Sequence, residues 1–141
     1  MAEAKSTAAF NYQAFLIVSV LALFSLLATN PALAAQGDWV NKQYKIKGSW
    51  EIEQSNGKTL IRFTKNFSTK GGPDLKVFLS RDNISALNGR IAINNAVLIS
   101  PLKSNRGSQT YTLPANINLE DFKSLIIHCE KYSVLWGGSN I

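Results

Sequence analysis

The stretch SLIIHCEKYSVLW, residues 124–136, carries the clearest strand signal in the sequence together with its only histidine and its only cysteine. Two short apolar runs, residues 125–129 and 133–136, flank a polar trio and predict two adjacent strands or one broken strand. Successive side chains of a strand point to opposite faces of its sheet. Cys129 and His128 therefore face opposite sides, which excludes a Cys-His catalytic dyad, since that needs hydrogen-bond contact.

Alternating runs and turn signals continue on the N-terminal side of this stretch. Between residues 40 and 137 we count about seven to nine short runs of β character, with turn signals roughly every 8 to 12 residues. The pair Asn56-Gly57 predicts a tight hairpin, and Pro101 limits its strand to a sheet edge or a strand end. The pattern predicts a single all-β domain, an antiparallel β-sandwich or a barrel-like arrangement.

Two segments between the strands need their own interpretation. Residues 71–74, Gly-Gly-Pro-Asp, have turn composition, and Asp74 is expected to accept hydrogen bonds from nearby backbone amides rather than to act as a site carboxylate. Residues 89–93 are expected to form a strand or part of a longer crossing. The candidate core consists of large apolar residues in the alternating runs: Trp50, Phe63, Leu75, Val77, Leu79, Tyr111, Leu113, Leu125, Ile127, Val134 and Trp136.

The N-terminus resembles a secretory signal peptide. Residues 14–28, AFLIVSVLALFSLLA, carry no charge, and a proline then precedes an Ala-x-Ala site at residues 32–34. We expect cleavage after Ala34 or Ala35. The alternative is an uncleaved membrane anchor, but the apolar run is shorter than the roughly 20 residues that span a bilayer.

Cleavage divides the chain into a signal peptide, residues 1–35, and an all-β domain, residues 36–141. The mature domain, which starts with a polar lead-in over residues 36–43, should have no stable membrane span. We expect it to be exported to the periplasm, the extracellular space or the cell surface.

The sequence of 141 residues has a formal net charge of +6. The basic residues are spread along the chain rather than clustered, which is typical of a solvated surface. Without a nucleic-acid-binding motif, no nucleic-acid partner is expected. Weak binding to anionic surfaces or acidic polymers stays open.

Several motifs together resemble the DM-thirteen domain family over residues 48–141. The motifs are Gly48-x-Trp50, Leu60-x-x-Phe63, Phe67, Gly72-Pro73-Asp74-Leu75-x-Val77-x-Leu79-Ser80, Gln109-x-Tyr111-x-Leu113-Pro114, Cys129 and Tyr132-x-Val134. The resemblance implies an all-β exported domain with a suggested redox or electron-transfer role that rests on a characteristic cysteine, matched here by Cys129. The sequence departs from the family pattern at His128, where tryptophan or tyrosine is usual, and at Trp136, where phenylalanine is common.

Cys129 supports two interpretations. As a redox thiol it would form a sulfenic acid or a mixed disulfide, or would exchange electrons with the cofactor of a redox or envelope protein partner. As a packing residue it would be a small buried hydrophobe, because free cysteines are often buried and Leu125 and Ile127 share its face. An odd cysteine in an exported chain also predicts a disulfide-linked dimer.

His128 and Trp136 are candidate cofactor-binding residues. His128 would be an axial haem ligand or one ligand of a copper site, and the ordinary alternative is a surface or half-buried histidine. The sequence requires no cofactor and lacks a set of three or four metal ligands.

Three functions follow in order. The first is an exported redox or electron-transfer domain that uses Cys129 and is not a stand-alone enzyme. The second is a non-catalytic binding or structural sandwich of the periplasm or cell envelope, and the third is a haem or copper binder through His128.

Overall fold

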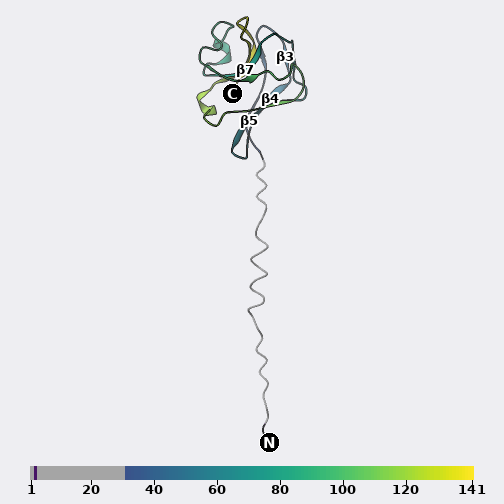
Figure 1. The fold of residues 1–141 in the computed structure, drawn as a ribbon, viewed down its shortest axis with the longest axis vertical. Helices are drawn as coiled ribbons and strands as arrows, with labels where there is room; N and C mark the ends of the chain where they lie inside the picture. Colours follow the sequence, from purple (N-terminus) through teal and green to yellow (C-terminus); the bar gives the residue numbers. More distant parts are fainter. Residues whose placement is uncertain (1, 3–30) are drawn as a thin grey trace.

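The computed structural model describes residue 2 and residues 31–141 (Figure 1). The proposed signal peptide thus lies largely outside the described residues. The described part is built from strands with two short 3-10 helices: β1 Ala32–Asp38, β2 Val40–Asn41, β3 Ile46–Lys47, β4 Ser49–Ser55, β5 Lys58–Phe63, β6 Ser68–Thr69, β7 Leu75–Ser80, η2 Ile84–Ala86, β8 Ala96–Pro101, β9 Gln109–Thr112, η3 Leu119–Asp121, β10 Ser124–Cys129 and β11 Val134–Asn140. In this part of the chain no helix is long and apolar enough to cross a membrane.

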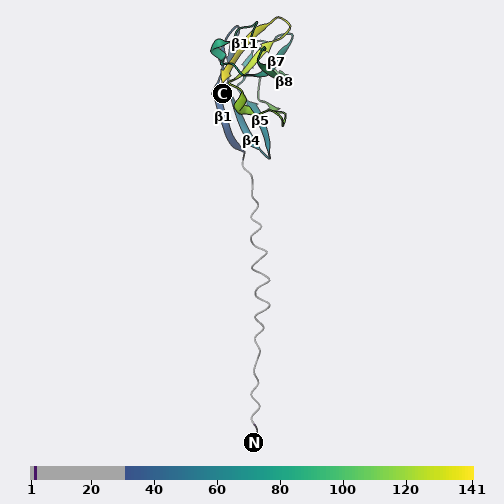
Figure 2. The same cartoon turned by 90° about the vertical axis from the view of Figure 1, so that its left-hand side faces the viewer.

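The strands form two larger antiparallel sheets. One sheet has the order β1-β4-β5-β9, and the other has the order β2-β11-β10-β7-β8, while β3 and β6 form a small separate pair. Figure 2 separates the two sheets, with β1, β4 and β5 below β7, β8 and β11. The prediction of an all-β antiparallel sandwich is confirmed, and β8, which ends at Pro101, lies at a sheet edge as expected.

The predicted hairpin joins β4 to β5. Ser55 pairs with Lys58, and the two residues between them, Asn56 and Gly57, have φ angles of 50° and 72°. Two consecutive residues with positive φ suit the tight turn that follows the twist of the flanking strands. The turn fixes the register in which Trp50 and Ile52 of β4 face the same side.

The main core lies between the two sheets. One sheet contributes Trp50, Ile52, Ile61, Phe63 and Tyr111, and the other contributes Val77, Leu79, Leu125, Ile127, Cys129 and Trp136. Phe63 is surrounded by rings, with centroid distances of 4.9 Å to Trp39 and 4.8 Å to Phe67. Every residue of the predicted core is buried in this cluster except Val134, which is partly buried against it.

A second apolar cluster covers the outer face of the five-stranded sheet. Phe78, Ile126 and Leu135 point outward from β7, β10 and β11 and pack beneath the segment 84–92. The expectation of a strand at residues 89–93 is wrong, because this segment consists of turns, closed by bonds such as the one from the Ala92 amide to the Asn88 carbonyl, 2.9 Å. The sheet is therefore covered on both faces around β10.

The chain enters the sandwich earlier than the sequence pattern indicates. Residues 36–38 belong to β1 rather than to a polar lead-in, and they pair with residues 49–51 of β4. Gly37 allows this close pairing, because a Cβ there would lie 2.7 Å from the Trp50 ring. The local hydrophobic pattern does not show that the Trp50 ring of the paired strand β4 leaves room only for a glycine at residue 37.

Candidate functional site

Cys129 is the last residue of β10 and lies at the end of the inter-sheet core. It pairs with Leu75 of β7 on one side and with Val134 of β11 on the other. Its exposed fraction is 0%, and it forms no disulfide. The thiol therefore has the apolar surroundings of a core residue, and a reagent in solution cannot reach it in this conformation.

Asp74, the last residue of the turn 71–74, forms hydrogen bonds with the two residues that follow Cys129. The Glu130 amide donates to the Asp74 carbonyl at 3.2 Å, and the Lys131 amide donates to Asp74 Oδ2 at 3.0 Å. Asp74 is thus an acceptor of backbone amides, as predicted, but the amides belong to the turn between β10 and β11 rather than to its own turn. The turn connects directly to Leu75, the strand partner of Cys129.

Ion pairs between charged side chains add to these hydrogen bonds at the surface. Lys76 Nζ lies 3.2 Å from Asp74 Oδ1 and also donates to Glu130 Oε2. The hydrogen bonds to Glu130 and then to Asp74 raise the pKa of the Lys76 ammonium above its ordinary value of 10.5. The Lys76 side chain therefore connects β7, the turn of residues 71–74 and the turn between β10 and β11.

Trp136 forms the other side of this region. It belongs to the same core cluster as Cys129, and its indole N–H donates to the Lys70 carbonyl at 3.0 Å. A Cβ at Gly72 would lie 3.0 Å from the indole ring, so the turn packs against that ring. The ring of Tyr44 lies 4.1 Å from that of Trp136, between centroids, and the Lys70 ammonium lies 4.8 Å from the Tyr44 ring.

His128 occupies the opposite face of the sheet, as the alternation predicts. Its Nε2 lies 2.8 Å from the Gly89 carbonyl oxygen, which it contacts as a donor in the Nε2–H tautomer, and its ring meets that of Phe78 edge-on at 6.1 Å. Among the described residues its Nδ1 has no hydrogen-bond partner. The ordinary alternative of a surface or half-buried histidine is wrong, since His128 is 1% exposed.

The structure does not bring the three predicted site residues together as one ligand set. Cys129 and Trp136 share the inter-sheet core, whereas His128 lies beneath the segment 84–92. Haem or copper ligation by His128 stays a prediction, and Nε2 would have to leave the Gly89 carbonyl. No group of three or more His, Cys, Asp or Glu side chains within residues 31–141 is placed to hold a metal ion.

Sequence reasoning predicted the turn at residues 71–74 but missed the cover that residues 84–92 form over the outer face of the five-stranded sheet. Its signal is present, because the runs LKVFLS at 75–80 and SLIIHC at 124–129 carry apolar residues on both faces of their strands. Such runs are typical of strands buried on both faces. They indicate that another part of the chain covers the outer face.

Fold and site together define an antiparallel β-sandwich with one buried thiol at the end of β10, whose strand partner Leu75 directly follows the turn of residues 71–74. The model of the family Electron transfer DM13 matches residues 38–141, well over half of the chain. The chain belongs to this family. The searches of curated proteins and of solved structures gave no match.

Proposed function

We propose that this chain is an exported electron-transfer domain that exchanges electrons with a partner protein through Cys129. The observation that carries the proposal is the position of Cys129 as the last residue of β10, where its strand partner Leu75 directly follows the turn of residues 71–74. That turn is held by the hydrogen bonds from the Glu130 and Lys131 amides to Asp74 and by surface ion pairs, beyond the last paired residues of β7 and β10. Its detachment would expose Cys129 while both sheets stay paired.

The reaction we propose is thiol-disulfide exchange with a disulfide of the partner. The Cys129 thiol loses its proton to water, and the thiolate attacks one sulfur of the partner disulfide. A new S–S bond forms, the partner S–S bond breaks, and the second partner sulfur leaves as a thiolate with the electron pair. Cys129 is oxidised and that sulfur is reduced, so the products are a mixed disulfide between Cys129 and the partner and one partner thiolate, which carries the electron pair away.

The burial of Cys129 explains why a partner is needed. A thiol with an exposed fraction of 0% is protected from small oxidants and from a second copy of the chain. The disulfide-linked dimer expected from the odd cysteine would need the same opening of the turn. A partner that binds the surface near Lys76 and Glu130 would select the open state.

Reaction with 5,5′-dithiobis(2-nitrobenzoate), a small aromatic disulfide, tests the proposal under native conditions. Asp74→Ala removes the acceptor of the Lys131 amide, and loss of about 1 kcal/mol should speed mixed-disulfide formation about fivefold. Asp74→Asn, which keeps a side-chain acceptor, should react more slowly than the alanine variant. Glu53→Ala, which breaks the ion pair with Arg62 on the other sheet, is the matched control and should leave the rate unchanged.

The second candidate is a binding or structural sandwich in which Cys129 only packs. The same burial favours it, because Cys129 lies with Leu125 and Ile127 in a continuous apolar cluster. It predicts that the thiol reacts only in denaturant and that Asp74→Ala and Glu53→Ala react alike. That outcome would favour the binding or structural function and would exclude Cys129 as a redox group.

A further inference from the structure

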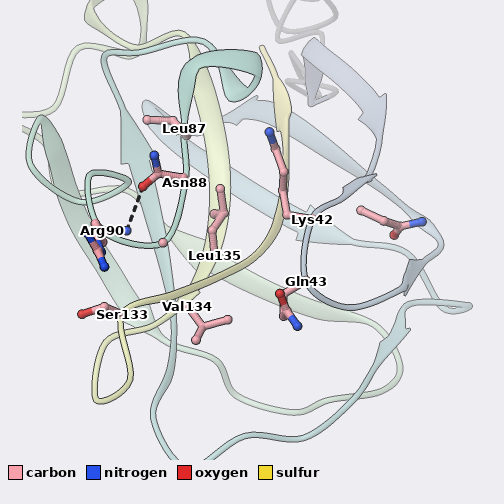
Figure 3. A pocket seen from close by; sticks show the side chains of 10 residues that line it. Lys42, Gln43, Leu87, Asn88, Arg90, Ser133, Val134 and Leu135 are labelled. Carbon is pink, nitrogen blue, oxygen red and sulfur yellow. Dashed lines mark hydrogen bonds between the residues drawn. The ribbon is translucent and has the colours of Figure 1, made fainter.

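A hollow with mixed polar and apolar lining lies beside the start of β11. It has a volume of about 740 Å³ and lies between residues 41–43 on one wall and residues 87–90 on the other, with 133–135 between them. Figure 3 shows Arg90 and Lys42 on either side of Leu135. This size is in the range of small-molecule sites, about 300 to 1,000 Å³.

The lining is rich in hydrogen-bond donors and carries only positive charge. It contains Lys42 and Arg90, the amides Gln43 and Asn88, and no carboxylate. Within residues 31–141 the salt bridges use Arg62 and Lys76, so neither lining cation is paired with an acidic side chain. A hollow with two unpaired cations favours an anion, since charge-assisted hydrogen bonds are the strong ones.

The floor of the hollow is apolar. Leu87 and Leu135 are buried there and Val134 is partly buried. Leu87 and Leu135 belong to the cluster that covers the outer face of the five-stranded sheet. A ligand that fits both floor and walls therefore combines an apolar body with a negatively charged group.

Both walls are held in place without a ligand. The amides of Lys42 and Gln43 donate to the carbonyls of Trp136 and Leu135, each at 3.2 Å. On the other wall, Asn88 Oδ1 accepts from the Arg90 amide at 3.0 Å (Figure 3). Walls fixed in advance reduce the ordering that binding would require.

Gly89 completes the second wall. The buried His128 contacts its carbonyl oxygen at 2.8 Å, and a Cβ on Gly89 would lie 2.1 Å from the Ser133 carbonyl oxygen. Only glycine lets the segment approach the β10–β11 turn so closely. His128 thus has a positioning role for the hollow, which accounts for a buried imidazole that the Cys129 chemistry does not use.

From these observations we infer that the hollow between residues 41–43 and 87–90 binds a small molecule with an anionic carboxylate, phosphate or sulfonate group and an apolar body. Lys42 and Arg90 bind the anion, and Leu87, Val134 and Leu135 contact the apolar part. The inference does not depend on the redox role of Cys129.

8-Anilinonaphthalene-1-sulfonate is a suitable probe, because it joins a sulfonate to aromatic rings. The chain should bind it saturably at one site, with shifts of the Gly89 and Ser133 amide resonances. Lys42→Gln/Arg90→Gln should weaken binding at least about tenfold, the effect of losing one charge-assisted contact. Both side chains are exposed, so the fold should be unaffected.

Lys58→Gln/Lys123→Gln is the control, since it removes the same charge from exposed positions outside the hollow. It should keep the affinity within about twofold, as expected for weak screened fields between distant charges. Equal weakening in both double variants, or unchanged binding in the first, would overturn the inference. Binding without saturation, or shifts confined to other amides, would overturn it as well.

Discussion

His128 and Cys129 are neighbours in the chain, but their side chains lie on opposite faces of β10. The Cys129 thiol belongs to the core between the sheets, whereas the His128 imidazole contacts the Gly89 carbonyl at 2.8 Å beneath the segment 84–92. The thiol and the imidazole therefore lie in two different regions of the domain. One is the turn of residues 71–74, and the other is the hollow beside β11.

His128 should contribute to stability through both its volume and its hydrogen bond. His128→Ala removes the ring and leaves the Gly89 carbonyl without its donor, so we expect a loss of about 2 to 4 kcal/mol in the free energy of unfolding. His128→Phe keeps the ring volume and should lose only about 1 to 2 kcal/mol. Urea denaturation measures both, and equal losses would contradict the role of the ring in packing.

Gly48 should be the least replaceable of the glycines with positive φ. Its φ is 84°, and a Cβ there would lie 2.8 Å from the backbone of Phe67. We expect Gly48→Ala to lower the free energy of unfolding by about 2 to 4 kcal/mol, from backbone strain and overpacking together. Gly57→Ala is the control, because φ is 72° but no atom lies within 4 Å, and it should lose only about 1 to 2 kcal/mol.

Ionisation of Tyr111 should lower the free energy of unfolding at alkaline pH. Its hydroxyl accepts from the Lys103 amide and donates to Gln109 Oε1, and burial raises its pKa above the ordinary 10.0. The stabilisation is complete below pH 10 and is lost as the pH rises from there toward the raised pKa, because the unfolded chain ionises first. Urea denaturation from pH 9 to 11 should show this fall, at most about 1.4 kcal/mol per pH unit from one group.

Tyr111→Phe should flatten that fall, although it also loses two hydrogen bonds at neutral pH. Tyr132→Phe is the control, since Tyr132 is 62% exposed and should leave the pH dependence as it is. A fall of the same steepness in Tyr111→Phe would show that other groups cause it.

The predicted signal cleavage falls inside β1. Loss of residues 1–35 removes the pairs between residues 32–35 and β4 but keeps those of residues 36–38. We expect an exported protein whose mass corresponds to a start at residue 35 or 36. Compared with residues 31–141, its free energy of unfolding should be lower by about 1 to 3 kcal/mol, the net value of a few backbone hydrogen bonds. A retained N-terminus would contradict cleavage.

The alternation of apolar residues predicts the sandwich and the inter-sheet core, and the Asn56-Gly57 pair predicts the hairpin. Strand alternation does not predict the second layer, because Ile84, Leu87 and Ala92 lie in a 3-10 helix and turns and pack on the outer face of the five-stranded sheet. The burial of His128 has the same cause. Periodicity assigns a face to a side chain, but only the tertiary fold shows what covers that face.

The candidate site was predictable in part. Strand alternation puts Cys129 on the same face as Leu125 and Ile127, and the turn composition of residues 71–74 predicts Asp74 as a backbone acceptor. The hydrogen bond from the Lys131 amide to Asp74 joins residues far apart in the sequence, and no local pattern reports it. The same is true of the contact between Gly89 and the β10–β11 turn.

The rate of reaction of Cys129 with the aromatic disulfide, measured as a function of urea below the unfolding transition, tests the redox role most directly. Detachment of a short turn exposes little surface, so the rate should hardly depend on urea and should exceed the rate set by global unfolding. Asp74→Ala should raise this urea-independent rate. A rate that rises with the full urea dependence of global unfolding would show that the thiol is reached only in the unfolded chain, and would contradict a redox role for Cys129 in the folded domain.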